Sequence, residues 1–570
     1  MFRKNTRHLQ PNLFGFYYML PERMKKEIKE SEEYAFYNII FRNIDEDIFA
    51  ILYSEKKSRP NAPINALVSS LILMNKKGWS YEALFKEIKF NILTKIALGL
   101  DSLEEIPFSP ATIFNFQNRL NRHFVKTGEN LLEQVFDKLT EKQLKALKIK
   151  TDIQRTDSFG AASNIRNYSR LQLLIELIIR LWRILDESDK EAFKDQFQNY
   201  VTQSSGQYIY KLTKDELPKE LSKIGELYYW IKTNLWEKYQ EQEIFKIFAR
   251  VFNEHFSVIG EKIEVKRNDE LKSDSIQSPD DLDASYRKKN GQVLKGQSVN
   301  IIETANPDNA INLLTDVSVN SANKDDSKVL NERIDKLKEK TPELKELHYD
   351  GAYGNSKNDE KLREHQITGI QTGVRGRNRK VSIEIYKDNE NNYHVKCPYQ
   401  EVIAVESRTR YKAEFNRSIC AQCPLKELCS IRENKKYRVF YFTENDYLTN
   451  KRQREISKIP EERRQIRNNV EATVKEFTEK MPNKKLKVRG LFKTGVFAYT
   501  TAIGINFGRI YRYIKGNNSK NYFIYFLRFI YFVLKTLFHN KLVFTNQEYQ
   551  RQSKTNEDVL YKSALVFAGF

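Results

Sequence analysis

Three acidic residues that lie far apart in the chain, Asp157, Asp350 and Glu471, each stand in a local sequence that suits a metal-bound catalytic carboxylate. The two aspartates follow runs typical of β-strands, and the glutamate lies in a segment with helical character. Two aspartates on strands and a glutamate on a helix can bind two divalent cations about 4 Å apart, which activate a water or a 3′ hydroxyl. The residue types therefore indicate phosphodiester cleavage.

The charge of the chain suits a polyanionic partner. Its 570 residues include 96 lysines and arginines against 75 aspartates and glutamates, which gives a formal net charge of +21. Basic side chains bind nucleic acid by displacing counterions from its phosphates. A lysine-rich composition alone would produce the same charge, so the argument depends on the acidic residues. Together they point to the cutting and joining of DNA strands.

The neighbours of the first aspartate support this assignment. Asp157 is followed by small polar residues and then by Arg166 and Arg170, which could hold a DNA phosphate near the cations. Asp152 is a competing first aspartate five residues earlier on the same expected strand. Because side chains alternate along a strand, its carboxylate would point to the other face. We therefore assign the first position to Asp157.

The other two acids also have a suitable context. Small residues follow Asp350 in the string DGAYG and would let a DNA backbone approach closely. Arg467 precedes Glu471 by four residues, so one helical face would carry both. The Arg467 guanidinium can hold a phosphate through two parallel hydrogen bonds or orient the carboxylate. Asp281 and Asp283 are interpreted instead as loop or helix-capping acids.

The four cysteines, Cys397, Cys420, Cys423 and Cys429, fall within one short stretch. This clustering favours metal binding over disulfides. The C-x-x-C pair is the strongest part of the pattern, and four thiolates would complete a closed, structural zinc site. The alternative is four buried free thiols, and His394 is a spare candidate ligand.

Residues 1–145 are predicted to be mostly helical. A turn at 77–80 separates two helices with apolar residues at helical spacing, and Ser80 is a suitable N-cap. Another helix is expected to begin at Ser109-Pro110. The layout is similar to a DNA-binding helix-turn-helix unit. The alternative is an ordinary helical bundle with a solvated basic face.

The rest of the chain predicts a mixed α/β sheet. Residues 147–157 are expected to form the strand that carries Asp157 near its end. Further strands after residue 291, a helix and a short strand ending at Asp350 follow. Long helical patterns between 171 and 264 predict an insertion. A charged helix at about 455–480 would carry Glu471, and one or two buried helices would come after it.

With these motifs the chain resembles bacterial insertion-sequence transposases of the DDE superfamily, which have an RNase H-like core. The resemblance rests on the strings DSFGAASNI at Asp157, DGAYG at Asp350 and RNNVE at Glu471, with the cysteine cluster before the glutamate. It covers about residues 10–515. The related signature of this superfamily has a Tyr and a Lys where this chain has Arg464 and Thr478. Lys475 or Lys480 could replace the missing lysine as a phosphate contact.

The resemblance implies a transposase that binds the terminal inverted repeats of its own element and cuts and joins DNA there. It implies Mg²⁺ or Mn²⁺ held by Asp157, Asp350 and Glu471, with Arg467 positioning phosphate. It also implies double-stranded DNA as the partner, and at least a homodimer when two ends are brought together. The expected fold is an α/β RNase H-like mixed sheet with an all-α N-terminal domain, a helical insertion and a small zinc-binding insertion.

The expected division of the chain follows these patterns. It comprises a helical DNA-binding domain (1–145), three parts of the catalytic core (146–175, 265–378 and 451–515), the helical insertion (176–264), the cysteine-rich insertion (379–450) and an aromatic helix and tail (516–570). The apolar run at 521–538 is interrupted by Arg528 and Lys535, so it is interpreted as a core or partner-facing helix. Without an apolar signal segment at the N-terminus, a cytoplasmic, nucleoid-associated protein with no membrane contact is expected.

Two rival functions remain open from the sequence. One is a zinc-containing DNA-binding protein that keeps the nuclease core only as a scaffold. The other is an RNase H-type nuclease that cuts without joining. Metal-dependent cleavage would separate the first rival from the favoured reading, and detection of strand-transfer products would separate the second.

Overall fold

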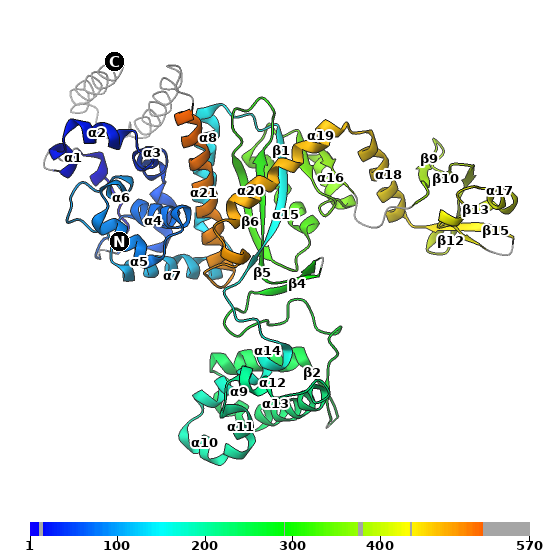
Figure 1. Ribbon diagram of the computed structural model, residues 1–570, viewed down its shortest axis with the longest axis horizontal. Coiled ribbons are helices and arrows are strands. Elements are labelled where there is room, and N and C mark those ends of the chain that lie inside the picture. Colours follow the sequence, from blue (N-terminus) through cyan, green and yellow to red (C-terminus); the bar gives the residue numbers. More distant parts are fainter. Residues whose placement is uncertain are drawn as a thin grey trace.

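The computed structural model describes residues 1–10, 15–56, 58–260, 262–289, 291–373, 380–433 and 436–516. A six-stranded sheet lies at the centre, with the N-terminal helices packed on one side of it (Figure 1). A helical insertion and a β-rich lobe project from the sheet in two other directions (Figure 1). The apolar run at 521–538 lies outside the described residues. No helix in the described ranges combines the length and the apolar character needed to cross a membrane.

The N-terminal region is helical, as its apolar spacing predicts. Its helices are α1 (Phe16–Met19), α2 (Glu22–Lys29), α3 (Glu32–Ile39), α4 (Ile64–Lys77), α5 (Tyr81–Phe90), α6 (Ile92–Ala97), α7 (Pro110–Thr127) and α8 (Leu131–Leu147), with short 3₁₀ turns at Arg7–Leu9, Phe41–Asn43 and Glu46–Leu52. Gly78 ends α4 with a left-handed backbone (φ 71°), and the Ser80 hydroxyl caps α5 by accepting a hydrogen bond from the Ala83 amide. α7 begins at Pro110, directly after Ser109. The predicted turn and both predicted helix starts are confirmed.

The central sheet is mixed. Its strands are β1 (Ile153–Ala162), β4 (Ser285–Lys289), β5 (Gln292–Thr304), β6 (Leu314–Ser321), β7 (Glu346–Tyr349) and β8 (Thr368–Gln371). The order is β4-β5-β1-β7-β8, and β6 also pairs with β5. β5 runs antiparallel to β1, β4 and β6, whereas β7 runs parallel to both β1 and β8. The carboxyl ends of β1, β4, β7 and β8 therefore lie toward one edge of the sheet.

Two expectations for this sheet need correction. The strand that carries Asp157 begins at Ile153 and continues to Ala162, so Asp157 lies near its centre and not near its end. Residues up to Leu147 belong to α8, which ends where Lys148 adopts a left-handed backbone. β4 was not expected at all, because its sequence SYRKK is polar and lacks the apolar alternation that reveals a half-buried strand.

Helices cover both faces of the sheet. On one face, α15 (Asp326–Lys340) and α16 (Ser356–Glu364) pack against β5 and β7 through an apolar cluster. On the other face lie α20 (Val470–Thr478) and α21 (Leu491–Gly516). Phe159 of β1 meets Phe477 of α20 there, with ring centroids 5.3 Å apart. Because strand side chains alternate, Asp157 lies on the same face as Phe159, the face that α20 covers.

The long helix α21 stands between the central sheet and the N-terminal helices and joins them (Figure 1). It is a single helix of 26 residues that packs against α4, α8 and β6. The buried Asn506 side chain accepts a hydrogen bond from the Leu314 amide at 2.8 Å and donates one to the Leu314 carbonyl at 3.0 Å. The Asn506 side chain thereby provides hydrogen-bond partners for backbone groups on the outer edge of β6. The N-terminal helices, α21 and this face of the sheet share one apolar core.

Residues 170–265 form the predicted helical insertion, which has an apolar core of its own. Its elements are α9 (Arg170–Ile184), α10 (Glu187–Ala192), α11 (Lys194–Val201), α12 (Ser205–Tyr210), α13 (Leu217–Tyr239), α14 (Glu243–His255), β2 (Phe256–Ile259) and β3 (Lys262–Val265). Arg170 donates hydrogen bonds to the backbone carbonyls of His255 and Lys266 at the base of the insertion. The guanidinium of Arg170 thus serves the fold, which corrects its expected role as a phosphate contact.

The cysteine-rich region forms a lobe of two small sheets. Its elements are β9 (Glu384–Lys387), β10 (Tyr393–Cys397), β11 (Gln400–Ile403), β12 (Val405–Ser407), β13 (Arg410–Asn416), α17 (Arg417–Ala421), a 3₁₀ turn (Lys426–Leu428), β14 (Arg432–Glu433) and β15 (Tyr437–Phe442). α18 (Glu444–Lys458) leads from this lobe back to the central sheet (Figure 1).

The charged helix predicted at about 455–480 is divided in the structure. α18 ends before Pro460, which cannot donate a backbone hydrogen bond and stands at the start of α19 (Glu461–Gln465). The 3₁₀ turn η5 (Ile466–Asn469) follows and carries Arg467, and α20 then carries Glu471 in its first turn. A further 3₁₀ turn, Pro482–Lys484, precedes α21.

Candidate active site

The fold brings Asp157 and Asp350 side by side. β1 and β7 are parallel neighbours whose last paired residues are Arg155 and His348, and two further residues along each chain lead to the two aspartates. Arg467, from the turn η5 above this face, points its guanidinium between them. Its Nη2 atom lies 2.9 Å from Asp157 Oδ2 and 3.9 Å from Asp350 Oδ2. Three of the four predicted catalytic residues therefore meet at one place.

Backbone amides orient both carboxylates. The Ser158 amide donates a hydrogen bond to Asp157 Oδ1 at 2.8 Å, and the Ala352 amide donates one to Asp350 Oδ1 at 2.7 Å. One oxygen of each aspartate is thus held by its own loop or strand, while the other oxygen faces Arg467. The pair presents two fixed oxygen donors toward one point.

The two aspartates differ in burial. The Asp157 side chain is 14% exposed and that of Asp350 is 29% exposed. Burial raises the pKa of Asp157, and the Asp350 carboxylate adds to the rise, although the Arg467 guanidinium and the Ser158 amide oppose it. Ionised Asp157 is therefore an anion in a poorly solvated place, a state that a bound cation would stabilise.

Glu471 has a different environment from the two aspartates. Its neighbours Val470 and Thr473 are buried against the sheet, whereas the Glu471 side chain is exposed. It forms no hydrogen bond or ion pair with a residue that the structure describes. Within the described ranges, no three His, Cys, Asp or Glu side chains are arranged to hold a metal ion. The structure therefore brings the two aspartates together without Glu471.

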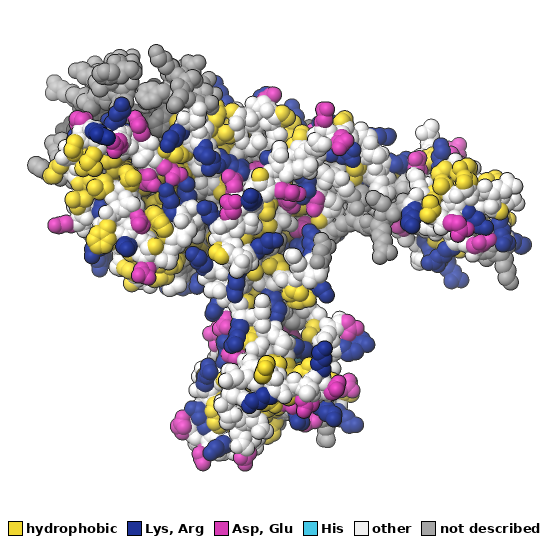
Figure 2. All heavy atoms as spheres, viewed as in Figure 1, with side chains coloured by type: hydrophobic (Ala, Val, Ile, Leu, Met, Phe, Trp, Pro, Cys, Tyr) yellow, Lys and Arg dark blue, Asp and Glu magenta, His cyan; other side chains and the backbone are white. Residues whose placement is uncertain are grey.

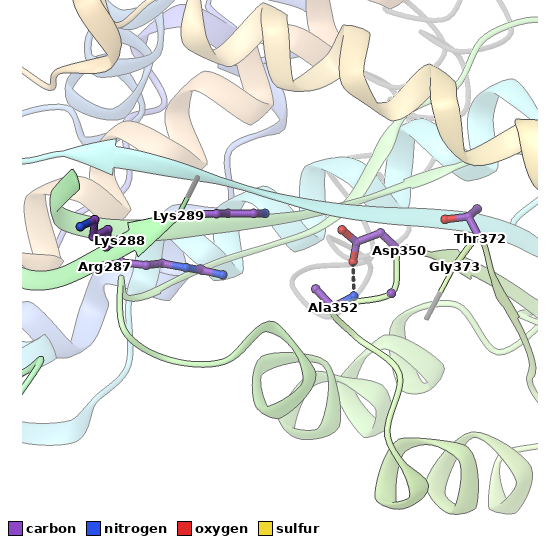
Figure 3. A pocket seen from close by; sticks show the side chains of 8 residues that line it. Arg287, Lys288, Lys289, Asp350, Ala352, Thr372 and Gly373 are labelled. Atoms are coloured by element: carbon purple, nitrogen blue, oxygen red, sulfur yellow. Dashed lines mark hydrogen bonds between the residues drawn. The ribbon is translucent and has the colours of Figure 1, made fainter. Parts of the chain in front are cut away.

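The donor set of the aspartate pair fits Mg²⁺. Carboxylate oxygens are the hard ligands that this ion prefers, and Mg²⁺ often binds through only one or two carboxylates, with water and phosphate oxygens completing its shell. Asp350 also opens into a cavity of about 510 Å³, which leaves room for such a phosphate (Figure 3). The pair can hold a cation at the place where a substrate would enter.

A buried network on the same face of the sheet as Asp157, which sequence reasoning missed, positions this site. Glu303 of β5 is fully buried, with its Oε1 atom 2.7 Å from Arg155 Nη2 and its Oε2 atom 2.7 Å from Arg509 Nη1. Thr473 of α20 also donates a hydrogen bond to Glu303 Oε2 at 2.7 Å. Arg155 in turn donates to the Ile466 carbonyl at 2.9 Å. Glu303 thus links β1, α20, α21 and, through Arg155, the turn that carries Arg467. The only sequence signal was an acid inside the apolar strand VNIIETA.

The remaining acids have structural roles. Asp152 precedes β1, where its carboxylate accepts a hydrogen bond from Asn306 at 2.7 Å, so it is not a second site residue. Asp281 and Asp283 accept hydrogen bonds from the amides of Gly490 and Leu491, each at 2.9 Å. These two amides lie at the start of α21, which confirms the interpretation as loop or helix-capping acids.

The structure does not show the predicted zinc site. Cys420 is buried in the apolar cluster of the β-rich lobe, and Cys397 and Cys429 pack partly buried against the same cluster. All four cysteines, including Cys423, are free of disulfides. Burial raises the pKa of the Cys420 thiol, and Gln400 donates a hydrogen bond to its sulfur at 3.1 Å. No set of three or more cysteines among the described residues fits a metal ion. This arrangement is that of thiols in an apolar cluster.

Two family models match the chain. One, described as a transposase DDE domain, matches residues 390–511, and the other, described as a transposase domain (DUF772), matches residues 23–119. Together these two matches support an insertion-sequence DDE transposase. The DDE match contains Arg467, Glu471 and the four cysteines, whereas Asp157 and Asp350 lie outside both matches. No curated protein and no solved structure matches the chain.

Replacing Glu303 by Gln tests the buried network of this protein. The variant leaves Arg155 and Arg509 as buried cations without their carboxylate, and breaking a buried ion pair in this way typically costs about 3–5 kcal/mol. We expect the midpoint of urea unfolding, followed by circular dichroism, to fall clearly. Glu264→Gln, at an exposed strand position, is the matched control. An unchanged midpoint in Glu303→Gln would show that the network contributes nothing.

Replacing Asp157 by Asn tests how much the buried carboxylate anion destabilises the folded protein. Because the folded state raises the pKa of Asp157, it binds that proton more tightly than the unfolded chain does. The stability that the proton contributes is fully present below the ordinary carboxyl pKa and is lost as the pH rises through the folded pKa. We expect Asp157→Asn to melt at or above the temperature of the unmodified protein at pH 7. This advantage should shrink as the pH falls toward the ordinary carboxyl range. A lower melting temperature at pH 7 would mean that the Arg467 ion pair outweighs burial.

Proposed function

We propose that this transposase binds the terminal inverted repeats of its own insertion sequence and catalyses metal-dependent DNA cleavage and strand transfer at their ends. The observation that carries the proposal is the placement of Asp157 and Asp350 on neighbouring strands, with Arg467 between them. Membership of the DDE transposases supports this reaction class.

The arrangement of the sheet supports an RNase H-like core. A central β1 has the antiparallel β5 on one side and the parallel β7 on the other, with helices on both faces. The acidic residues stand on β1 and directly after β7, the two strands whose carboxyl ends lie toward one edge. In open α/β sheets, functional groups gather at such an edge because the loops there converge.

In the proposed mechanism, Asp157, Asp350 and Glu471 would hold Mg²⁺ or Mn²⁺. Such cations, when bound, supply a Lewis acid that activates the attacking water or 3′ hydroxyl and neutralises charge on the phosphate. Asp157 must be ionised for this role, and Arg467 helps because its positive charge opposes the rise in the pKa of Asp157. Water is the nucleophile for cleavage, and the freed 3′ hydroxyl is the nucleophile for joining.

Arg467 has a second role in this proposal. Its guanidinium bridges the two aspartates, and its Nε atom is buried without a hydrogen-bond partner among the described residues. A donor left unpaired in a buried place is stabilised by a ligand that accepts from it. An incoming phosphate oxygen can do so, and the planar guanidinium suits a contact through two parallel hydrogen bonds. We infer that Arg467 holds the phosphate that is cut.

The N-terminal helices are the proposed DNA-binding domain. The exposed side of α7 carries Arg119, Arg122 and Lys126 beside a cavity of about 430 Å³. Basic side chains on an exposed helix suit phosphate contacts. Joining two element ends to one target requires both ends in one complex, so we infer at least two copies of the chain in the active assembly.

A cleavage assay with Asp350→Asn tests the reaction. Duplex DNA with the inverted repeats that flank the gene is incubated with Mg²⁺ or with EDTA. We expect the unmodified protein to cut at the repeat boundary and form strand-transfer products with Mg²⁺ only. Loss of a metal-binding carboxylate should slow cutting by at least about 100-fold. Asp308→Asn, on an exposed loop, is the matched control. Tight binding without cutting would favour the DNA-binding rival, and cutting without joining would favour the nuclease.

Glu471→Gln tests the third ligand separately. Glu471 is exposed on α20 and forms no hydrogen bond or ion pair with a described residue, so the substitution should leave the melting temperature unchanged. If α20 presents Glu471 to the cations when DNA binds, Mg²⁺-dependent cutting should fall by at least about 100-fold. Glu479→Gln, at the far end of the same helix, is the matched control. Cutting by Glu471→Gln at the rate of the control would remove this residue from the mechanism.

A further inference from the structure

A basic strand borders the cavity into which Asp350 opens. The cavity has a volume of about 510 Å³, and Figure 3 shows the side chains that line it. Its wall on one side is β4, with Arg287, Lys288 and Lys289, and on the other side the residues after β7 and β8, with Asp350, Ala352 and Thr372. The DDE and DUF772 matches contain none of these residues, and β4 itself was not expected from the sequence.

The alternation of side chains along β4 places its three basic residues on two different sides of the strand. Residues 287 and 289 share one side because side chains alternate along a strand. Figure 3 shows Arg287 and Lys289 directed toward the Asp350 side of the cavity and Lys288 directed away from it. Two cations therefore face the aspartate across the cavity, and the lysine between them does not.

The two facing cations are held differently. Arg287 Nη2 donates a hydrogen bond to the buried Asp326 Oδ2 at 3.0 Å. Asp326 Oδ1 accepts another from the hydroxyl of Ser158 at 3.0 Å, and Ser158 directly follows the catalytic Asp157. Arg287 is thus oriented from the same strand that carries the first aspartate. Lys289 is exposed and forms no hydrogen bond or ion pair with a described residue, so its charge is available to a ligand.

Close packing of β5 against the end of β1 fixes the position of β4. β4 pairs with the first residues of β5, and Ser285 pairs with Gly296. A side chain at Gly296 would collide with the backbone of Ala161 and Ser163. The glycine therefore lets β5 lie tightly against the end of β1, which places the basic strand beside the cavity that Asp350 lines. The cations are part of the folded edge of the sheet and not of a free loop.

We propose that β4 and the loop after Asp350 form a cradle for the sugar–phosphate backbone of the DNA strand that adjoins the cut phosphodiester. Arg287 and Lys289 each contact a phosphate beside the one that the aspartates engage. This inference rests on the proposed function, because it needs DNA at Asp350. The negatively charged metal site and the two cations lie on opposite sides of one cavity. This arrangement suits a ligand that carries regularly spaced phosphates. Each neutralised phosphate also releases counterions, which makes the contact measurable through salt.

Lys289→Ala and Lys288→Ala form the test pair. The probe is a duplex ending in the inverted repeat, used unmodified or with one neutral methylphosphonate at successive positions next to the cut. For Lys289→Ala we expect the slope of log affinity against log salt to decrease by about 0.9, the value for one lost phosphate contact. A methylphosphonate at one position should weaken binding and slow cutting by the unmodified protein. It should have no further effect on Lys289→Ala, because the contact is already gone. Lys288→Ala should match the unmodified protein in both measurements.

The outcomes separate this inference from the proposed function. Metal-dependent cutting with an unchanged salt slope and an undiminished methylphosphonate effect in Lys289→Ala would overturn the cradle and leave the transposase reaction standing. An equal loss in Lys288→Ala would show that general positive charge, and not this face of β4, attracts the DNA, which also overturns the cradle. Absence of any metal-dependent cutting by the unmodified protein would overturn both proposals.

Discussion

The buried carboxylate of Glu303 holds together the parts of the chain on which the site depends. Its two oxygens are bound by Arg155 from β1, Thr473 from α20 and Arg509 from α21. Ions inside a protein are stable only when such partners replace the lost hydration. Because these partners come from segments distant in the sequence, the ionic network can form only when strands and helices are in place together. It therefore determines where the turn with Arg467 lies above the aspartates.

The fixed charges around the site form three groups. Glu303 is paired with Arg155 and Arg509, Arg467 lies between the two aspartates, and Arg287 and Lys289 line the cavity into which Asp350 opens. Arg467 neutralises part of the aspartate charge in the folded protein, which limits the cost of placing two carboxylates side by side. In Figure 2, basic side chains are interspersed with acidic ones over the visible face, so the net charge does not by itself mark the site. The site is marked instead by the arrangement of a few fixed charges.

The apolar cores show which parts of the molecule pack together. The N-terminal helices share an apolar core with one face of the sheet through α21, which fixes their position relative to the aspartates. The helical insertion and the β-rich lobe each have a core of their own and project from the sheet (Figure 1).

The sequence by itself determined the helical N-terminal region, the helix caps at Ser80 and Ser109-Pro110 and the helical insertion, and it singled out the two aspartates that the structure brings together, because each has a local pattern of apolar spacing, capping residues or motif strings. Only the tertiary structure decided the path of β4, the break at Pro460, the Glu303 network and the separation of Glu471 from the aspartate pair. These features depend on contacts between residues far apart in the chain. Local propensity carries no information about such contacts, because the energy that decides them comes from burial and charge pairing in three dimensions.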